Sequence, residues 1–276
     1  MAAAEPYTGA AAIARLWRRG SVGGRLPWSL RWQSVCTSTE LGLSRWLEDK
    51  PWPDPQPFSE PQPFSEPQPR ALFAARQIRA RGQQGRVWQA PSGGVWISAA
   101  MPWPKQPSLV AVFGLAVALA LAEQLESYGL PVRIKWPNDL ILQGRKLAGV
   151  LPRLVHRGDQ VRLARIGLGL NVCNPVPREG IALCEILSAG QCLTQKWSAQ
   201  VLWALERSMD LLGQTEWLLA QVEKRLWTNV LKDPVGGEPW QVLGLRNDGA
   251  LRLQRGSEAV IWTRWDQSMN RLDTCR

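Results

Sequence analysis

Two lysines, an asparagine and an aspartate lie close together in a segment that otherwise has the pattern of a buried β-hairpin. The segment reads Lys135-Trp136-Pro137-Asn138-Asp139-Leu140, followed by Gly144-Arg145-Lys146-Leu147-Ala148-Gly149. Polar side chains are costly to bury unless they meet partners. A lysine ammonium is a compact charge that can reach both a carboxylate and a phosphate. The hairpin therefore predicts a binding site for an anionic ligand.

A second basic segment combines arginines with glycines. It reads Gln77-Ile78-Arg79-Ala80-Arg81-Gly82-Gln83-Gln84-Gly85-Arg86-Val87-Trp88. Guanidinium groups and backbone N–H groups on such a loop can surround phosphate oxygens. Taken alone, the pattern is also compatible with an arginine-rich surface hairpin or a nucleic-acid patch.

Two shorter runs complete the set of candidate site segments. The hydroxyls of Ser38 and Thr39 can pair with the carbonyl and N–H groups of a urea, although capping a helix explains them equally well. The run Ile166-Gly167-Leu168-Gly169-Leu170-Asn171 places glycines in a strand, where the backbone can pack flat against a ring.

Together and in this order, the four segments resemble the motifs of the biotin–protein ligase family, which includes the biotin–[acetyl-CoA-carboxylase] ligases and holocarboxylase synthetases. Lys146 matches the essential lysine of that family, and residues 80–88 are similar to its GRGRxGRxW loop. Ala80 and Gln83 depart from the loop pattern, where glycine and arginine are usual, and Glu40 stands in place of an asparagine. Gln83 can donate hydrogen bonds but cannot neutralise charge. The resemblance extends from about Ser38 to the C-terminus.

The resemblance implies ATP-dependent ligation of biotin to a lysine of the biotin carboxyl carrier protein of acetyl-CoA carboxylase, through biotinyl-5′-AMP. ATP and Mg²⁺ are the implied cofactors, and no metal ligands are identified. The implied catalytic residues are Lys146, Arg81 and Asp139, with Asp139 orienting or helping to deprotonate the carrier lysine. The implied biotin contacts are Ser38, Thr39, Glu40, Gln77, Arg81, Gly82, Gln83, Trp88, Lys146, Gly149, Gly167 and Gly169. The implied ATP contacts are Arg81, Arg86, Lys135, Asn138, Lys146 and Asn171.

The elements that must position these residues can be predicted from local patterns. Strands are expected over 30–36, 94–100, 132–136, 139–143, 146–151 and 161–170, with a tight turn at Gln143-Gly144-Arg145. Helices are expected over 11–19, 41–47, 107–128, 195–212 and 214–229. Short strands at 240–246, 250–254 and 259–262 predict a small C-terminal barrel.

These elements predict an α+β fold, a mixed β-sheet with helices packed on one face. The resemblance adds a class II synthetase-like catalytic core and an SH3-like C-terminal β-barrel. We expect an N-terminal segment (1–33), a catalytic domain (34–232) and a C-terminal domain (233–276). A proline-rich insertion at 51–69 contains an exact repeat, Pro-Gln-Pro-Phe-Ser-Glu at 55–60 and 61–66, and predicts polyproline II conformation.

Composition limits the class of protein. The longest apolar run, Leu109 to Ala122, is too short to span a bilayer, so no membrane association is expected. The five cysteines include no CxxC pair, which argues against a zinc site or a disulfide framework and favours a cytoplasmic protein. The stretch before Ser38 is too short for a helix-turn-helix domain. We therefore expect a monofunctional enzyme, monomeric or weakly dimeric, that binds no DNA.

Two alternatives remain open on the sequence. A lipoate– or octanoate–protein ligase would share the fold and the adenylate chemistry. A nucleic-acid-binding module could use the net charge of +10 and the 16 tryptophans, and its affinity would collapse with salt.

Overall fold

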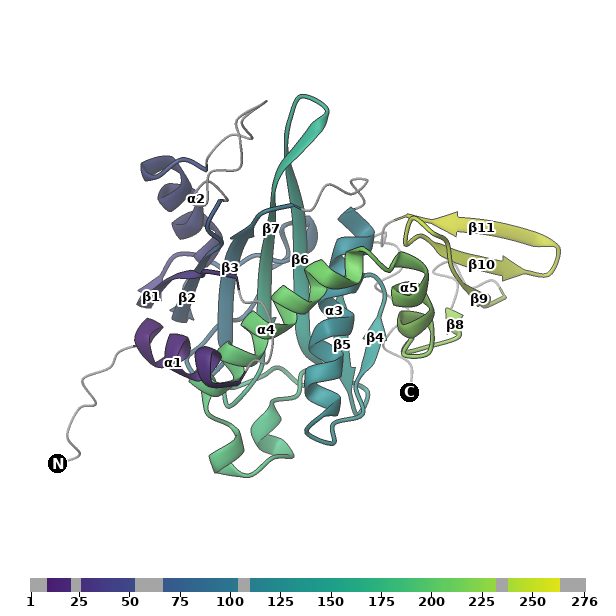
Figure 1. Ribbon diagram of the computed structural model, residues 1–276. Coiled ribbons are helices and arrows are strands. Elements are labelled where there is room, and N and C mark those ends of the chain that lie inside the picture. Colours follow the sequence, from purple (N-terminus) through teal and green to yellow (C-terminus); the bar gives the residue numbers. More distant parts are fainter. Residues whose placement is uncertain (1–8, 21–25, 53–66, 104–109, 232–237, 264–276) are drawn as a thin grey trace.

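The computed structural model describes residues 9–20, 26–52, 67–103, 110–231 and 238–263. Its main body is a seven-stranded mixed sheet in the order β1-β2-β3-β7-β6-β5-β4 (Figure 1). The strands are β1 (Ser29–Cys36), β2 (Arg70–Gln77), β3 (Val95–Met101), β4 (Arg133–Lys135), β5 (Asp139–Leu142), β6 (Arg145–Arg157) and β7 (Gln160–Leu170). Strands β1 and β2 run parallel, and all the other neighbours in this sheet are antiparallel. The predicted α+β fold with a mixed sheet is confirmed.

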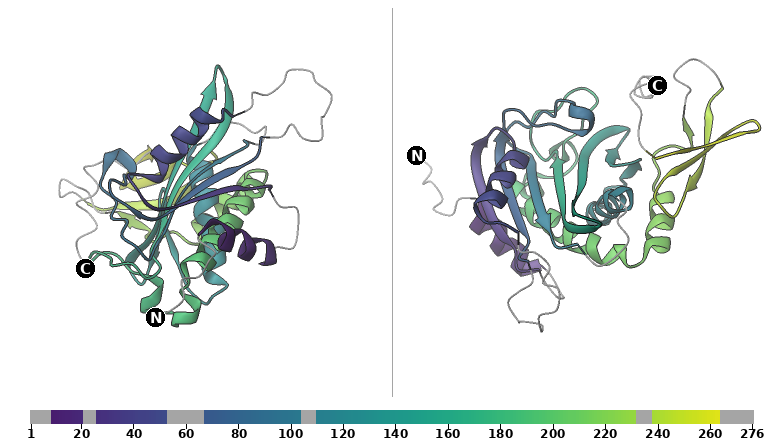
Figure 2. Two further views of the ribbon diagram at one scale, coloured as in Figure 1. Left: turned by 90° about the vertical axis from the view of Figure 1, so that its left-hand side faces the viewer. Right: turned by 90° about the horizontal axis from the view of Figure 1, so that it is seen from above.

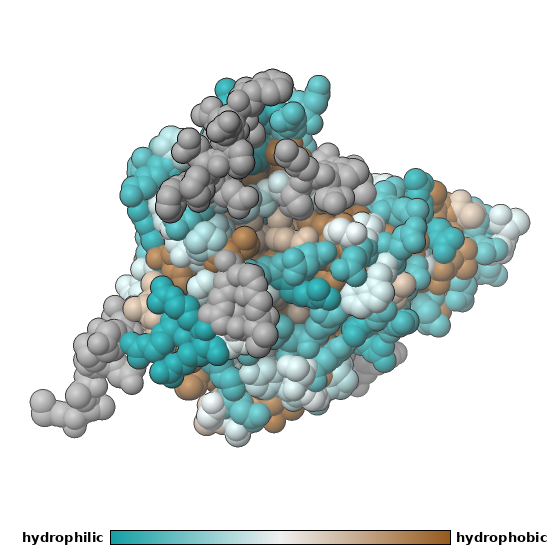
Figure 3. Space-filling view, viewed as in Figure 1, coloured by the Kyte–Doolittle hydropathy of each residue, from teal (hydrophilic) through white to brown (hydrophobic). Residues whose placement is uncertain are grey.

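The five helices divide between the two faces of the sheet, whereas the sequence analysis expected helices on one face; β3 is buried on both sides and is therefore covered from both. They are α1 (Ala10–Gly20), α2 (Thr39–Asp49), α3 (Val110–Glu126), α4 (Thr194–Leu212) and α5 (Thr215–Glu223). Helices α1, α3 and α4 cover one face, whereas α2 lies on the other (Figure 2). Helix α3 is apolar on nearly all sides, which is typical of a helix buried between a sheet and another helix. The outer surface over α1 and α4 is largely hydrophilic, with scattered apolar residues (Figure 3).

Strand alternation separates the two cores. Val95, Ile97 and Ala99 of β3 point into the main core with α3 and α4. Ala100 points the other way and packs with Leu43 of α2 in a smaller cluster. The face that carries α2 is therefore only partly covered, and this leaves room for a pocket beside it.

The β5–β6 hairpin is closed by Gln143 and Gly144, which have φ angles of 50° and 73°. Two successive positive φ angles define a type I′ turn, whose twist matches that of the flanking strands. The predicted tight turn is confirmed. The register then shifts between Leu140 and Ile141, so that Leu147 is an extra residue on β6. A bulge of this kind re-aims the neighbouring side chains.

Two predicted elements differ from the structure. The helix expected over 214–229 ends at Glu223, because the chain after it pairs with β4: Ile134 N–H donates to Arg225 O at 2.7 Å and Trp227 N–H donates to Ile134 O at 2.9 Å. The helical pattern of the sequence was overridden by this tertiary pairing. Strand β6 continues beyond the predicted end at 151, because Pro152 is accommodated opposite Ile166.

The C-terminal part forms a four-stranded antiparallel sheet in the order β11-β10-β9-β8. Its strands are β8 (Val230–Leu231), β9 (Trp240–Leu245), β10 (Leu251–Arg255) and β11 (Glu258–Trp262). The two edge strands, β8 and β11, are not paired with each other among the described residues, so this part of the chain shows the predicted antiparallel strands but not a closed barrel. The small sheet lies to one side of the main body (Figure 1), and Trp136 Nε1 donates to Gly249 O at 2.9 Å across the junction.

The expected domain boundaries remain predictions. Most of the proline-rich insertion, residues 53–66, lies outside the described residues. Over the described ranges, none of the helices combines the length and the apolar character needed to cross a membrane.

Candidate functional site

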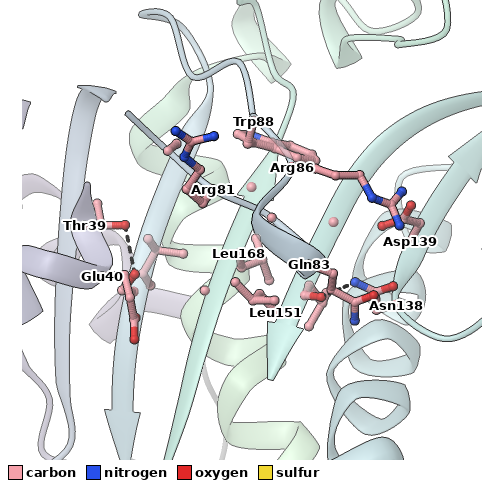
Figure 4. Close-up of a pocket in the computed structure, with 18 of the residues that line it drawn as sticks. Thr39, Glu40, Arg81, Gln83, Arg86, Trp88, Asn138, Asp139, Leu151 and Leu168 are labelled. Carbon is pink, nitrogen blue, oxygen red and sulfur yellow. Dashed lines mark hydrogen bonds between the residues drawn. The ribbon is translucent and has the colours of Figure 1, made fainter. Parts of the chain in front are cut away.

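A single pocket collects the predicted site residues from segments far apart in the chain (Figure 4). Its walls come from the start of α2, the loop after β2, the β4–β5 connection, and the central parts of β3, β6 and β7. The predicted residues that line it are Ser38, Thr39, Glu40, Gln77, Arg81, Gly82, Gln83, Arg86, Trp88, Lys135, Asn138, Asp139, Lys146, Gly149, Gly167 and Gly169. Asn171 is the one predicted site residue that does not line it.

One end of the pocket offers uncharged hydrogen-bonding groups, and the carboxylate that lines it, Glu40, is held in an ion pair. The backbone N–H and Oγ1 of Thr39 both donate to Gln77 Oε1, at 2.7 and 3.1 Å. Thr39 Oγ1 also lies 2.9 Å from Ser98 Oγ. Because Gln77 Oε1 accepts two bonds, its amide nitrogen is the group that it can offer to a ligand. This end suits a neutral polar ring such as a urea.

Two residues at this end were not predicted from the sequence. Ser98 is 1% exposed and is the one hydroxyl residue in the apolar run Val95–Met101. Arg165 is nearly buried, and its Nη2 lies 2.8 Å from Glu40 Oε1 and donates to Ser44 Oγ at 2.9 Å. A polar residue interrupting an apolar strand was the available signal in both cases. Arg165 ties the first turn of α2 to β7.

Ser38 has two roles that the sequence analysis treated as alternatives. It is the N-cap of α2, and its Oγ accepts a hydrogen bond from Glu40 N–H at 3.2 Å. It also lines the pocket. The capping bond fixes the start of α2 and thereby places Thr39 over Gln77.

The other end of the pocket is dominated by the Lys146–Asp139 ion pair. Lys146 Nζ lies 2.6 Å from Asp139 Oδ2 and 4.9 Å from the centre of the Trp88 ring. Both charged side chains are partly exposed, at 37% and 19%. The bulge at Leu147 allows Lys146 and Gly149 to line the same pocket although they are three residues apart. The ammonium is thus held at a fixed point on the pocket wall.

Trp88 packs flat over two glycines. A Cβ at Gly169 would lie 2.7 Å from Trp88 Cζ2, and a Cβ at Gly149 would lie 3.0 Å from Trp88 Cζ3. Any larger residue at Gly169 would displace the indole. Among the described residues, the buried Nε1 of Trp88 has no hydrogen-bond partner. An unpaired buried donor is costly, so this N–H is available to a ligand that enters the pocket.

Further cations line the pocket, with Arg81 toward the Thr39 side and Arg86 toward Asp139 (Figure 4). Arg81 Nη1 donates to Gly85 O at 3.1 Å and Arg86 Nη2 donates to Gln84 Oε1 at 2.9 Å, and these bonds hold the loop in a turn. The Arg86 guanidinium reaches across the pocket toward Asp139 (Figure 4). The pKa of Lys135 is lowered to about 8, mainly by burial; Asp139 opposes this shift, and Lys146 and Arg86 add to it. This concentration of positive charge suits a polyphosphate.

The side chains of the two asparagines, Asn138 and Asn171, are hydrogen-bonded to backbone carbonyl groups. Asn138 Nδ2 donates to Val150 O. Asn171 is buried, its Nδ2 donates to Lys146 O at 3.3 Å, and its Oδ1 accepts from Asn174 Nδ2 at 3.0 Å. Asn171 therefore supports the main chain of Lys146 from behind the pocket, which differs from the expected direct ligand contact.

The pocket offers few ligands for a metal ion. Glu40 and Asp139 are the carboxylates among its lining residues, and both are in ion pairs. Within the described part of the chain there is no group of three or more His, Cys, Asp or Glu side chains arranged to hold a metal.

Comparison with known proteins agrees with the geometry of this pocket. Residues 61–171 match the biotin/lipoate A/B protein ligase family. A bifunctional ligase/repressor of Bacillus subtilis is 36% identical over 104 residues, which cover 36% of this chain and 31% of that protein. A biotin–[acetyl-CoA-carboxylase] ligase of Paracoccus denitrificans is 33% identical over 105 residues, covering 37% and 43%. The chain thus spans less than half the length of these relatives.

The fold is similar to a solved structure over most of its length. The biotin protein ligase of Aquifex aeolicus, in complex with biotin and ATP, superimposes with a TM-score of 0.63 and covers 84% of this chain and 94% of that one. The two sequences are 24% identical, so this likeness concerns the fold.

Proposed function

Because residues 61–171 match the biotin/lipoate A/B protein ligase family, we propose that the protein joins biotin to a lysine of a carrier protein at the expense of ATP. The observation that carries the proposal is the single pocket in which a neutral hydrogen-bonding end adjoins a cationic end built around Lys146. Such a pocket can hold an uncharged bicyclic urea, its carboxylate tail and a nucleotide phosphate in line. The relatives that act on biotin support this assignment.

In the first step, an oxygen of the biotin carboxylate attacks the α-phosphorus of ATP, and pyrophosphate leaves. Negative charge grows on the phosphoryl oxygens in the transition state. Lys146 is held beside Asp139 at 2.6 Å, where its ammonium can stabilise this charge without reorganising. Arg81, Arg86 and Lys135 neutralise the remaining phosphates.

In the second step, the ε-amine of a carrier lysine attacks the carbonyl carbon of biotinyl-5′-AMP, an amide forms and AMP leaves. The attacking amine must lose a proton, since a lysine at its ordinary pKa is protonated at neutral pH. Asp139 lies next to Lys146 and is 19% exposed, so it is positioned to orient the incoming ammonium and help remove its proton. Trp88 walls the mixed anhydride off from water on one side.

Magnesium is expected to accompany the triphosphate. Asp139 is the one carboxylate at the cationic end of the pocket, and Mg²⁺ usually binds through substrate phosphates with one or two carboxylates. The ion would lower the charge of the phosphates that Arg86 and Lys135 face.

The proposed carrier is the biotin carboxyl carrier protein of acetyl-CoA carboxylase. The name of the Paracoccus relative supports this choice.

A cytoplasmic setting fits the free cysteines Cys36, Cys173, Cys184 and Cys192. A monomer or weak homodimer is proposed on the sequence alone.

The test is intact-mass spectrometry of a purified carrier domain incubated with the full chain, MgATP and equal concentrations of biotin and lipoate. A mass gain equal to a biotinyl group is the expected result. The matched control is the carrier with its acceptor lysine replaced by arginine, which should gain no mass.

A lipoyl gain would retain the fold and the adenylate chemistry and overturn the acid assignment. Absence of any gain with a folded protein would overturn the ligase proposal.

A further inference from the structure

Three of the five cysteines gather at one place outside the pocket, although they are spread over twenty residues of the sequence. Cys173 follows β7, and Cys184 and Cys192 lie in the long connection to α4. Cys173 lies close enough to Cys184 and to Cys192 for its thiol to influence the pKa of each of theirs, and for theirs to influence its own. Cys173 Sγ also donates to Cys192 O at 3.6 Å. A cluster of three thiols needs an account that the ligation chemistry does not provide.

Backbone hydrogen bonds hold the segments that carry Cys173 and Cys184 side by side. Leu183 N–H donates to Asn171 O at 3.2 Å and Cys184 N–H donates to Val172 O at 2.8 Å, so the segments that carry Cys173 and Cys184 run alongside each other. Both cysteines are exposed, whereas Cys192 is buried and its Sγ donates to Leu187 O at 3.7 Å. Burial is the largest cause that raises the pKa of all three thiols. The accessible pair is therefore Cys173 and Cys184.

We propose that Cys173 and Cys184 form an oxidative modification site, at which a hydroperoxide converts the two thiols into an intramolecular disulfide. The thiolate of Cys173 attacks the terminal oxygen of the hydroperoxide, the O–O bond breaks, and a sulfenic acid forms with release of an alcohol or water. The thiol of Cys184 then attacks the sulfenic sulfur, and water leaves as the S–S bond forms. The hydroperoxide is reduced by the two electrons that the thiols lose.

The chain between Cys173 and Cys184, which the disulfide would close into a loop, is hydrogen-bonded to the backbone of Lys146. Lys146 N–H donates to Glu179 O at 2.8 Å, and Ile181 N–H donates to Lys146 O at 3.0 Å. Arg145 adds a hydrogen bond to Gly180 O at 3.1 Å and an ion pair with Glu185 at 2.6 Å. Residues 179–185 thus hold both sides of the Lys146 backbone and lie between the two cysteines or next to them.

Closing the disulfide shifts this support. The two sulfur atoms, which are free thiols in the structure, must approach to about 2.05 Å, and the segments that carry them must follow. A displacement of about 1 Å at a catalytic group can cost up to about a hundredfold in rate. We expect the disulfide to lower adenylation by about tenfold; this consequence rests on the proposed function, whereas the disulfide itself does not.

The sequence allows the bond to be mapped directly. The full chain is treated with tert-butyl hydroperoxide, the remaining thiols are alkylated, and the protein is digested with trypsin and Glu-C without reduction. Cleavage after Arg165, Arg178, Glu179, Glu185 and Lys196 separates Cys173, Cys184 and Cys192 onto the peptides 166–178, 180–185 and 186–196. The expected product is peptide 166–178 linked to 180–185, lost on treatment with dithiothreitol. Cys184→Ser removes this product, and the matched variant Cys192→Ser retains it.

Biotin-dependent pyrophosphate exchange is measured on the same samples before oxidation, after oxidation and after dithiothreitol. A reversible fall of about tenfold in wild type, absent in Cys184→Ser, supports the link to Lys146. Unchanged exchange in a fully cross-linked sample overturns that link. A link to 186–196, a link between two chains, or oxidation to sulfinic acid without any link overturns the proposed site. If the chain shows no exchange even when reduced, the proposed function fails, but the peptide map still decides the disulfide.

Discussion

At the scale of single residues, the site depends on charges that are held in place before any substrate arrives. Lys146 is fixed by Asp139 at 2.6 Å, and Asn171 and Ile181 fix the backbone that carries it. Preorganised charge stabilises a transition state more than flexible charge does, because no reorganisation is needed during the reaction. The positions of these groups, more than their number, should therefore set the rate.

Replacing Lys146 with alanine should reduce adenylation by about a hundredfold or more, since one preorganised charge is lost from the phosphoryl site. The fold should persist, because the side chain is 37% exposed and the lost contact is one ion pair. Pyrophosphate exchange measures the rate, and a thermal melt checks the fold. Asp139→Asn is the matched control and should retain more of the first step than Lys146→Ala. Exchange within threefold of wild type in a folded Lys146→Ala variant would contradict the role of Lys146.

Lys135 should make ATP binding depend on pH. Its pKa is lowered to about 8, mainly by burial, so its side chain is charged below pH 8 and neutral above it. A bound triphosphate favours the charged form, and ATP affinity should therefore fall as the pH rises, by about tenfold between pH 7 and pH 9. Titration calorimetry at several pH values measures the affinity. Lys135→Arg keeps its charge across this range, and an equally steep pH dependence in that variant would argue against Lys135.

At the scale of elements, the pocket depends on β6 and β7 having no side chains where Trp88 lies. Gly149 and Gly169 are paired across these strands, and both contact the indole. The strands thus form a flat floor, and the loop that carries Trp88 closes over it. The bulge at Leu147 belongs to the same arrangement, because it lets Lys146 and Gly149 line one pocket.

Gly169→Ala should displace Trp88 and raise KM for ATP or biotin by about tenfold, because the new Cβ would lie 2.7 Å from the ring. Steady-state kinetics measure the change. Gly167→Ala is the comparison within the same strand and should have a smaller effect, since its Cβ would meet Leu151 Cβ at an ordinary 3.5 Å. If the second change Trp88→Phe fails to relieve any of the Gly169→Ala defect, a clash with the indole is not the cause.

At the scale of the whole molecule, the small C-terminal sheet and the seven-stranded sheet share one core. Trp240, Leu251 and Leu253 pack in the same hydrophobic cluster as α3 and the central strands. The junction includes Trp136, which is buried, lines the pocket and donates to Gly249 O at 2.9 Å. A change in the packing of the C-terminal sheet can therefore reach the hairpin that carries Lys135 and Asp139.

Trp136→Phe should loosen the C-terminal sheet, because Gly249 O loses its donor at a buried position, at a cost of about 1–3 kcal/mol. Hydrogen exchange followed by mass spectrometry should show faster exchange over residues 240–255. Trp197→Phe is the matched control, since it removes an indole donor to Gln191 O at 2.9 Å elsewhere in the core. Equal exchange over 240–255 in the two variants would contradict a specific role for the Trp136 contact.

Much of the site could be predicted from the sequence because its residues are clustered in short segments that resemble the motifs of a known family, and some of these segments also carry local constraints. The residue types at Gln143 and Gly144 predicted the tight turn that the structure shows. The hydroxyl of Ser38 likewise predicted the helix cap that it forms. Sixteen predicted residues line one pocket. Asn171, which the resemblance implies as an ATP contact, does not line the pocket, and its side chain holds the backbone of Lys146 instead.

The sequence by itself determined the order of strands and helices, the apolar face of each element and the residue types that could neutralise phosphate. Only the tertiary structure decided that β7 lies between β3 and β6, that α2 occupies the pocket face, that Arg165 holds Glu40, and that Cys173, Cys184 and Cys192 meet. The physical reason is that periodicity and turn chemistry act over a few neighbouring residues. Contacts between distant segments depend instead on which strands pair and how the core packs.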